Sequence, residues 1–274
     1  MADAKQTSAE KQTAAKRYGD LKSNRKEAET RAKRCAKVTL PRLWVDEGAK
    51  SRTPGSAYID TGPKCVNALA SKIVLAWLPP NASVFKLAPD QAVAENIAEQ
   101  AGVETSELEA ALVDVERVIV NDLETSGVRP VLSEAAKHAI VLGNFLLYDP
   151  DEGKPKLYPL TSYVTDRDGL GNVLEIITLD KIAPAMLPDS IRAAVMQKLA
   201  QERDEKTKND DVNLYTWVRR SEDGKEWEVV QEVEGVEVPE TVGTYPIDAC
   251  PWIPLCAPPS LVDDYGEGLV YDLS

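Results

Sequence analysis

Few side chains in this sequence have the types and spacing that catalysis requires. His138 is the single histidine, so a Ser-His-Asp or Cys-His arrangement would have to use it. It falls in a segment with helical apolar spacing, which favours a packed or exposed histidine over a general base. The GLG at residues 169–171 lacks the third glycine and following helix of a dinucleotide site, and no GxxxxGKS/T loop is present. We expect no catalytic residues and no cofactor.

The side chains that could bind a metal are also poorly spaced. Asp166 and Asp168 are two residues apart, as in calcium loops, but no glutamate follows at the twelfth position. Aspartates beside glycines are more typical of a hairpin turn. The four cysteines, at positions 35, 65, 250 and 256, form no CxxC pair, and His138 alone could join them on zinc. We interpret them as reduced, structural thiols and expect no metal site.

Charge is distributed unevenly along the 274 residues. Residues 5–42 carry 12 Lys or Arg against 4 Asp or Glu, a local charge of +8. The whole chain carries −13, so the remainder carries −21. An acidic body binds phosphates poorly, because that affinity comes from Lys and Arg that displace counterions. A nucleic acid would therefore have to contact the basic arm.

The basic arm is residues 1–50, and its segment 8–37 is predicted to be helical. Its apolar residues lie near one thin stripe: Tyr18, Leu21, Ala28, Ala32 and Cys35. A helix with so little apolar surface usually packs on a neighbouring element or on a partner subunit, although a solvated surface helix is the alternative. We propose the following cations as candidates for contact with another subunit or a capsid protein: Lys16, Arg17, Arg25, Arg31, Lys33 and Arg34.

The elements between these residues predict an α+β fold, with a helical N-terminal arm and helices packed on antiparallel β-hairpins. Ser133 is the expected N-cap of a helix over residues 134–148. Strands over 157–165 and 172–179 follow, joined by a glycine-containing turn. The second strand is apolar on both faces, so both must be covered. We expect Ile177, Leu179 and Leu146 to be buried together.

Five regions are predicted along the chain. They are the arm (1–50), an α+β core with the helix-hairpin unit (51–186), a helix and polar connection (187–211), a β meander with a Pro-rich extended segment (212–262), and the start of a helix (263–274). Within them we expect a short strand over 83–87, helices over 64–78, 89–100, 106–127 and 188–201, and a hairpin of 212–219 with 226–233. No apolar run approaches the ~18 residues of a membrane span, and a secretory signal is lacking. We expect a soluble protein made in the host cytoplasm.

Several strings resemble the portal (head-to-tail connector) proteins of short-tailed, podovirus-type bacteriophages. The first is NALASK at residues 67–72, and the longest is GNFLLYDPDEGKPKLYPLTSYVTDRDGLGNVLEIITLDKIA at 143–183. The others are LPDSIRAAV at 187–195, DVNLYTW at 211–217, VEGVEV at 233–238 and GTYPIDACPWIP at 243–254. The resemblance covers nearly the whole chain and keeps the order of the segments.

This resemblance implies a non-enzymatic subunit of a homo-oligomeric ring, a dodecamer, at one vertex of the virion capsid. Such rings assemble with major capsid protein and scaffolding protein, let terminase pass double-stranded DNA inward without sequence specificity, and bind the tail adaptor protein. The matched part is the outer, wing-like α+β region, truncated before the stem helices where residues 265–269 resemble the approach to the first of them. The sequence is expected to be a fragment or a shortened product.

Two other hypotheses stay open at this point. The chain could be a shortened capsid- or scaffold-binding protein that does not form a ring. It could also be an enzyme that uses Asp166, Asp168 and a metal ion. A ring-sized species in solution would favour the portal hypothesis over a capsid- or scaffold-binding protein. Thermal stabilisation by a metal ion would favour the enzyme.

Overall fold

The computed structural model describes residues 12–44, 60–80, 84–102, 104–202, 211–257 and 264–272. Its helices are α1 (Ala14–Asn24), α2 (Lys26–Val38), α3 (Thr61–Trp77), α4 (Gln91–Ala101), α5 (Thr105–Thr125), α6 (Val128–Leu142), α7 (Asp189–Glu202) and α8 (Leu269–Asp272). Its strands are β1 (Asn144–Tyr148), β2 (Lys156–Pro159), β3 (Tyr163–Arg167), β4 (Val173–Ile182), β5 (Val212–Arg220), β6 (Glu226–Val233), β7 (Val236–Glu237), β8 (Gly243–Pro246) and β9 (Trp252–Cys256). Helices and antiparallel sheets together confirm the α+β class.

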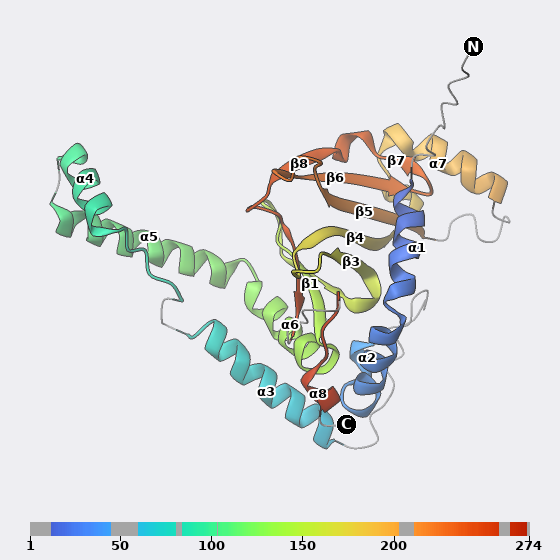
Figure 1. The fold of residues 1–274 in the computed structure, drawn as a ribbon, viewed down its shortest axis with the longest axis horizontal. Coiled ribbons are helices and arrows are strands. Elements are labelled where there is room, and N and C mark those ends of the chain that lie inside the picture. The colour runs from blue at the N-terminus through green and yellow to red at the C-terminus, as the bar shows by residue number, and fades with distance from the viewer. Residues whose placement is uncertain are drawn as a thin grey trace, which may run out of the picture.

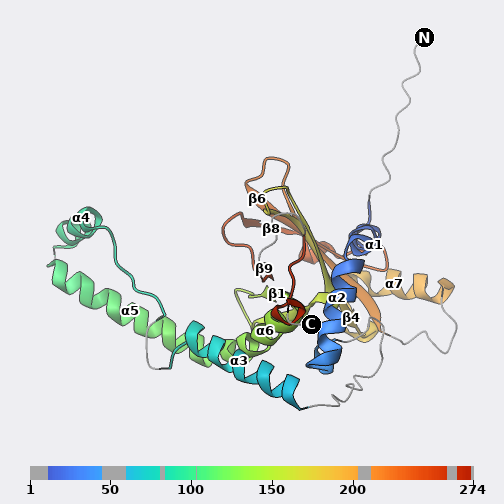
Figure 2. The same cartoon turned by 60° about the horizontal axis from the view of Figure 1, so that its bottom comes forward.

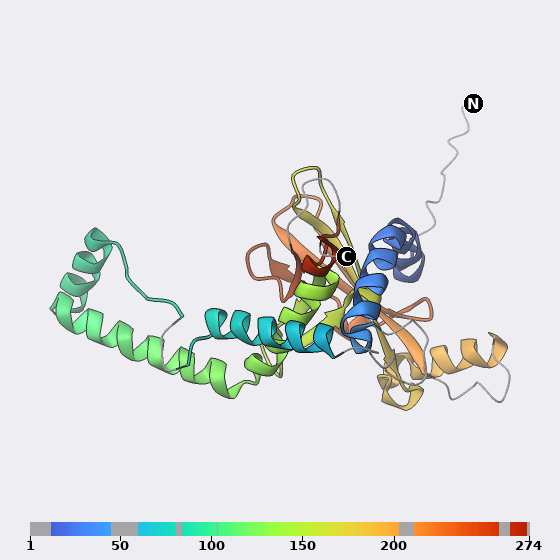
Figure 3. The same ribbon diagram turned by 90° about the horizontal axis from the view of Figure 1, so that it is seen from below.

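The strands form two antiparallel sheets. The larger sheet has the order β3-β4-β5-β6-β7, with β8 also paired to β6, and the smaller has the order β2-β1-β9. Helix α1 runs along one side of the larger sheet, and α2 packs against α6 and α8 (Figure 1). Helices α3, α5 and α4 form an extension that reaches away from the body (Figure 1). The turned views show the same extension (Figures 2 and 3).

The helix expected over residues 134–148 is wrong at both ends. It begins at Val128, after the left-handed Gly127, and Ser133 lies inside it rather than at its N-cap. It ends at Leu142, because Gly143 takes φ +73° and its N–H donates to the carbonyl of His138. The remaining five residues form β1, which pairs with β2 and β9 on its two sides. Pairing with distant strands therefore outweighs the helical spacing of these apolar residues.

The strand expected over residues 157–165 is also wrong as a single element. A turn of 3-10 helix (Leu160–Ser162) divides it into β2 and β3, which belong to different sheets. Leu160 is fully buried at this corner, so the interruption places an apolar side chain in the core. Residues 84–87 are irregular rather than a strand, and residue 83 lies outside the described part.

Both predicted hairpins are confirmed. Strands β3 and β4 pair from Tyr163–Thr178 onward, and β5 and β6 pair from Leu214–Val233 to Arg220–Trp227. Both faces of β4 are covered, since Ile176 belongs to one buried cluster and Ile177 to another. Leu179 is buried in the same cluster as Ile177, as expected. Leu146 is also buried but belongs to the other cluster, so the expectation that all three pack as one group is wrong.

The arm forms two helices rather than one within residues 12–44. The helix is interrupted at Arg25, between α1 and α2. The five apolar residues of the predicted stripe are all buried. Tyr18 and Leu21 pack with Val164, Ile177 and Leu179 on one face of the larger sheet. The arm therefore packs on its own chain, and the solvated-helix alternative is wrong for these residues.

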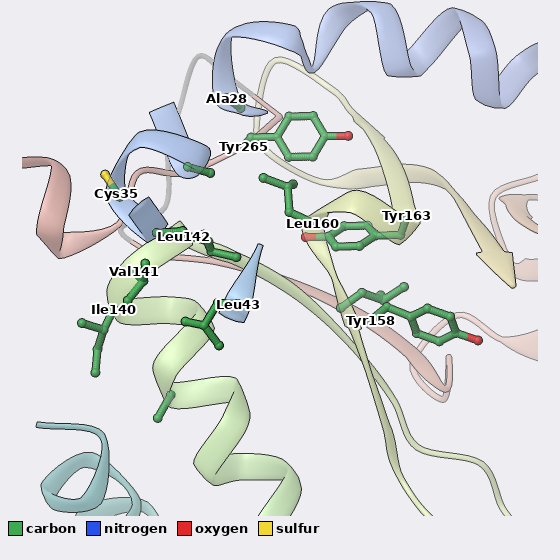
Figure 4. Close-up of a cluster of buried hydrophobic side chains, with 14 of the residues drawn as sticks. Ala28, Cys35, Leu43, Ile140, Val141, Leu142, Tyr158, Leu160, Tyr163 and Tyr265 are labelled. Atoms are coloured by element: carbon green, nitrogen blue, oxygen red, sulfur yellow. The ribbon is translucent and has the colours of Figure 1, made fainter. Parts of the chain in front are cut away.

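The largest buried cluster joins segments that are far apart in the sequence. Side chains from α2, α6, β2, the 3-10 turn and the C-terminal segment converge there (Figure 4). Within it Tyr265 is buried, and its hydroxyl accepts a hydrogen bond of 3.0 Å from the backbone N–H of Thr165. The end of the described chain is thus anchored in the core.

Residues 264–268 cross the junction of α6 and β1 at very close range. Asn144 donates to the carbonyl of Gly266 at 2.7 Å and accepts from its N–H at 2.8 Å, a reciprocal pair of buried bonds. A Cβ atom at Gly268 would overlap the backbone carbonyl of Val141. Only glycine leaves room for the two backbones at this crossing.

We predict that Gly268→Ala lowers the free energy of unfolding by about 2 kcal/mol or more, since backbone atoms must move to admit the methyl group. Gly169→Ala is the matched control, because a Cβ there would meet nothing within 4 Å. It should stay within about 0.5 kcal/mol of wild type in urea unfolding. Equal changes in the free energy of unfolding for the two substitutions would mean that Gly268 and Val141 do not approach as closely as described.

Candidate assembly surface: the basic arm

The N-terminus of α1 is held on the larger sheet by a carboxylate. The N–H of Ala14 donates to Glu232 Oε2 at 2.8 Å, and Thr13 caps the helix by accepting from the N–H of Lys16 at 3.3 Å. A carboxylate at a helix N-terminus satisfies free N–H groups and complements the helix dipole. Glu232 is buried here, although the alternation along β6 indicates a solvent-facing residue.

Arg17 fixes the middle of α1 to the same sheet. Its Nε donates to Glu175 Oε1 at 2.6 Å, and its Nη2 donates to Asp166 Oδ2 at 3.0 Å. The indole N–H of Trp217 donates to the other oxygen of Glu175 at 2.8 Å. Hydrogen bonding to Glu175 raises the pKa of Arg17, so the arginine stays charged in this network.

Arg25 is fully buried where α1 meets α2. Its Nη1 donates to the carbonyl of Leu160 at 2.6 Å and to that of Tyr163, and its Nε donates to Glu29 Oε1 at 2.8 Å. The guanidinium thus satisfies two carbonyls at the corner between β2 and β3. The spacing 18, 21, 25, 28, 32, 35 repeats at three and four residues, so Arg25 occupies a position of the apolar stripe. That spacing is the signal that could have marked it as buried.

The six candidate cations divide into two groups of three. Arg17 and Arg25 bind their own chain as above, and Arg31 Nε lies 3.3 Å from Glu267 Oε1. Lys16, Lys33 and Arg34 lie on the exposed side of the arm. The sequence places all six on one helix but does not distinguish these roles.

Asp166 and Asp168 use their oxygens in different contacts. Asp166 pairs with Arg17, whereas Asp168 Oδ1 accepts from the N–H groups of Leu170 and Asn172 at 2.9 and 2.8 Å. The latter closes the β3–β4 turn, as predicted, and hydrogen bonding from Asn172 lowers the pKa of Asp168. Among the residues that the structure describes, no three His, Cys, Asp or Glu side chains are grouped to hold a metal ion.

His138 is buried in α6 rather than set in a cleft. Burial lowers its pKa to about 4, and its Nδ1 finds no hydrogen-bond partner among the described residues. It is therefore neutral at neutral pH. Cys35 is buried in the core, Cys65 is exposed on α3, and Cys250 and Cys256 are half-buried, each as a free thiol.

A groove of about 910 Å³ lies between the start of α1 and the outer strands of the larger sheet. Its charged lining is mostly carboxylate: Glu175, Glu228, Glu232 and Glu237 face Arg17 and Arg219. Glu175 and Glu232 already bind the arm, and Arg219 pairs with Glu228 at 3.0 Å. The groove is thus an extension of the arm's docking site. None of the described helices is long and apolar enough to cross a membrane.

Taken together, the fold and the arm define an α+β chain whose N-terminal arm is held on the body by Glu232, Arg17 and Arg25. Lys16, Lys33 and Arg34 are exposed on the other side of the arm. The chain belongs to the family of bacteriophage head to tail connecting proteins, since that family's model matches residues 11–274.

Three curated relatives are similar to it over most of its length. The portal protein of Escherichia phage T7 is 36% identical over 244 residues, which cover 87% of this chain and 44% of that protein. The portal protein of Enterobacteria phage T3 is 36% identical over 260 residues, covering 93% and 48%. The portal protein of Enterobacteria phage SP6 is 30% identical over 245 residues, covering 89% and 46%. The chain spans about half the length of these relatives.

We predict that Arg25→Met lowers the free energy of unfolding by roughly 3 kcal/mol, because two buried carbonyls lose their donor. Lys33→Met, on the exposed side of the same helix pair, should change it by less than about 0.5 kcal/mol. Chemical denaturation of both variants measures the difference. A stability of Arg25→Met equal to wild type would contradict the described role of Arg25.

We predict that His138 makes the fold sensitive to acid. The unfolded chain takes up this proton near its ordinary pKa of 6.5, whereas the folded chain stays neutral until about pH 4. Stability from this residue is therefore complete above pH 6.5 and is lost as the pH falls from 6.5 toward 4. Between pH 7 and 4.5, His138→Gln should lose roughly 2 kcal/mol less stability than wild type. Identical pH profiles in urea unfolding would refute this assignment.

Proposed function

We propose that this chain forms the wing-like part of a portal subunit, within a homo-oligomeric ring at one capsid vertex of a virion. The main support for this proposal is that the connector family's model matches residues 11–274 and that the chain is similar to three phage portal proteins. The proposed role is structural. The ring would serve capsid assembly, passage of double-stranded DNA during packaging and ejection, and tail attachment.

The proposed partners follow from the same relationship. They are further copies of the chain in a dodecameric ring, major capsid protein, scaffolding protein, tail adaptor protein and terminase. The excess of carboxylates outside the arm supports a body that lets DNA pass without binding it tightly.

The arm is proposed to serve assembly through its exposed side. Lys16, Lys33 and Arg34 are exposed, whereas Arg17 and Arg31 are partly buried and Arg25 is fully buried, so the contact with an adjoining subunit or a capsid protein is assigned to Lys16, Lys33 and Arg34. Exposed ion pairs contribute individually only ~0–1 kcal/mol, but they sum when an interface is repeated around a ring.

We predict that a Lys16→Glu, Lys33→Glu and Arg34→Glu triple variant folds normally but enters particles poorly when it is produced with capsid and scaffolding proteins. A matched control reverses three exposed lysines outside the arm, Lys154, Lys181 and Lys225, with the same change in net charge. High salt should reproduce the defect of the arm variant, because the Debye length falls to ~3 Å at 1 M.

The outcome distinguishes the remaining hypotheses. Normal incorporation of the arm variant with lost, salt-dependent DNA affinity would make the arm a nucleic acid contact. Imaging of particles with the wild-type chain tests the function itself: a ring at one vertex supports it, and particle binding without a ring indicates a capsid- or scaffold-binding protein instead.

A further inference from the structure

Helix α5 carries an apolar face that the described residues of the chain do not cover. Val115, Val118 and Ile119 are spaced by three and four residues, so they share one side of the helix, and their exposed fractions are 46%, 68% and 38%. Among the elements that the structure describes, α5 contacts α4 near one end and α6 near the other. This part of α5 is therefore open among the residues that the structure describes.

Helix α3 carries a second open face. Cys65, Leu69, Lys72 and Leu75 are exposed and spaced by three or four residues, and Leu69 and Leu75 are 40% and 52% exposed. The opposite side, with Val66, Ala70 and Val74, is buried in the core cluster that includes α6. The open face of α3 therefore points away from α6.

The two faces differ in charge sign. Helix α5 contains six carboxylates against one arginine, with Asp122 next along the open stripe after Val118 and Ile119. Helix α3 contains Lys64 and Lys72 and no acidic residue. The helices have 21 and 17 residues, so they could run together for about 25 Å at 1.5 Å per residue. The apolar residues 115, 118 and 119 beside Asp122 on α5 and the apolar residues 69 and 75 beside Lys72 on α3 are therefore suited to pack on each other.

One copy cannot bring these two faces together without releasing α3 from α6. We propose that the open face of α5 in one copy packs on the open face of α3 in the next copy. Such a contact joins two different surfaces of the same chain, and a heterologous contact of this kind closes into a ring when its rotation permits. The inference rests on the proposed ring, and it assigns the helices that join neighbouring subunits there.

The native thiol of Cys65 lies on the open face of α3 and provides the test. In a Val115→Cys variant, a short bismaleimide should link position 115 of one copy to Cys65 of another, as mapped by peptide mass spectrometry. Val113 is the matched control, because it is equally exposed, at 45%, but lies on the opposite side of α5. We expect at least about tenfold more intermolecular product from Val115→Cys than from Val113→Cys, and none from Val115→Cys with Cys65→Ser.

The mass of the wild-type protein in solution is measured first, before cross-linking, so that failure of this interface can be distinguished from failure of the ring. An oligomer in which Val115→Cys fails to link Cys65, or links no better than Val113→Cys, overturns this inference and leaves the ring intact. A link between two copies of position 115 that survives Cys65→Ser also overturns it, in favour of a symmetric contact. A wild-type chain that stays monomeric at high concentration, without the link, overturns the proposed ring and this interface with it.

Discussion

The structure depends on the cover that the arm gives to one apolar face of the larger sheet. Val164, Ile177 and Leu179 on that face pack against Tyr18 and Leu21 of α1. Burial of side chains of this size stabilises a fold by about 1.5–3 kcal/mol each, which is far more than the exposed ion pairs around them provide. Apolar burial therefore supplies most of the docking energy of the arm. Its charges determine where along the sheet it docks.

Because the charges determine where the arm docks, its cations are not equivalent. Glu232 holds the first turn of α1, Glu175 holds the next through Arg17, and Arg25 enters the core where the chain must bend. A buried charge is tolerated there because the guanidinium donates to two buried carbonyls and to the carboxylate of Glu29. Lys16, Lys33 and Arg34 on the opposite side are exposed, and the proposed contact with other molecules is assigned to them for that reason.

The sequence predicted local elements better than their partners. Both hairpins, the covered faces of β4 and the buried arm stripe could be read from periodicity and turn residues. The exchange of helix for strand at residues 144–148 could not, because β1 is stabilised by pairing with β9, more than a hundred residues away. The residues of β9, 252–256, include a proline and therefore indicate a strand only weakly. The sequence predicts an interface contact for Arg25, whereas the structure buries it in the core. Its burial could not be predicted, because the carbonyls that it binds become neighbours only after the corner at Leu160 forms.

The same reasoning separates the surfaces of the chain that are complete from those that are not. Where the arm meets the sheet, apolar contacts and charge partners are supplied by the same chain, and little remains to be satisfied. On the extension, α3 buries one side and leaves the other with exposed apolar side chains and lysines. Helix α5 is exposed or half-buried along its length apart from Glu116, and its charges are mainly acidic. Scattered exposed apolar residues are ordinary, but two short apolar stripes on helices of opposite prevailing charge form a complementary pair. Because the stripes lie on different helices, each copy could cover one stripe of a neighbour while its own second stripe stays open for the next, and only a closed arrangement covers all of them.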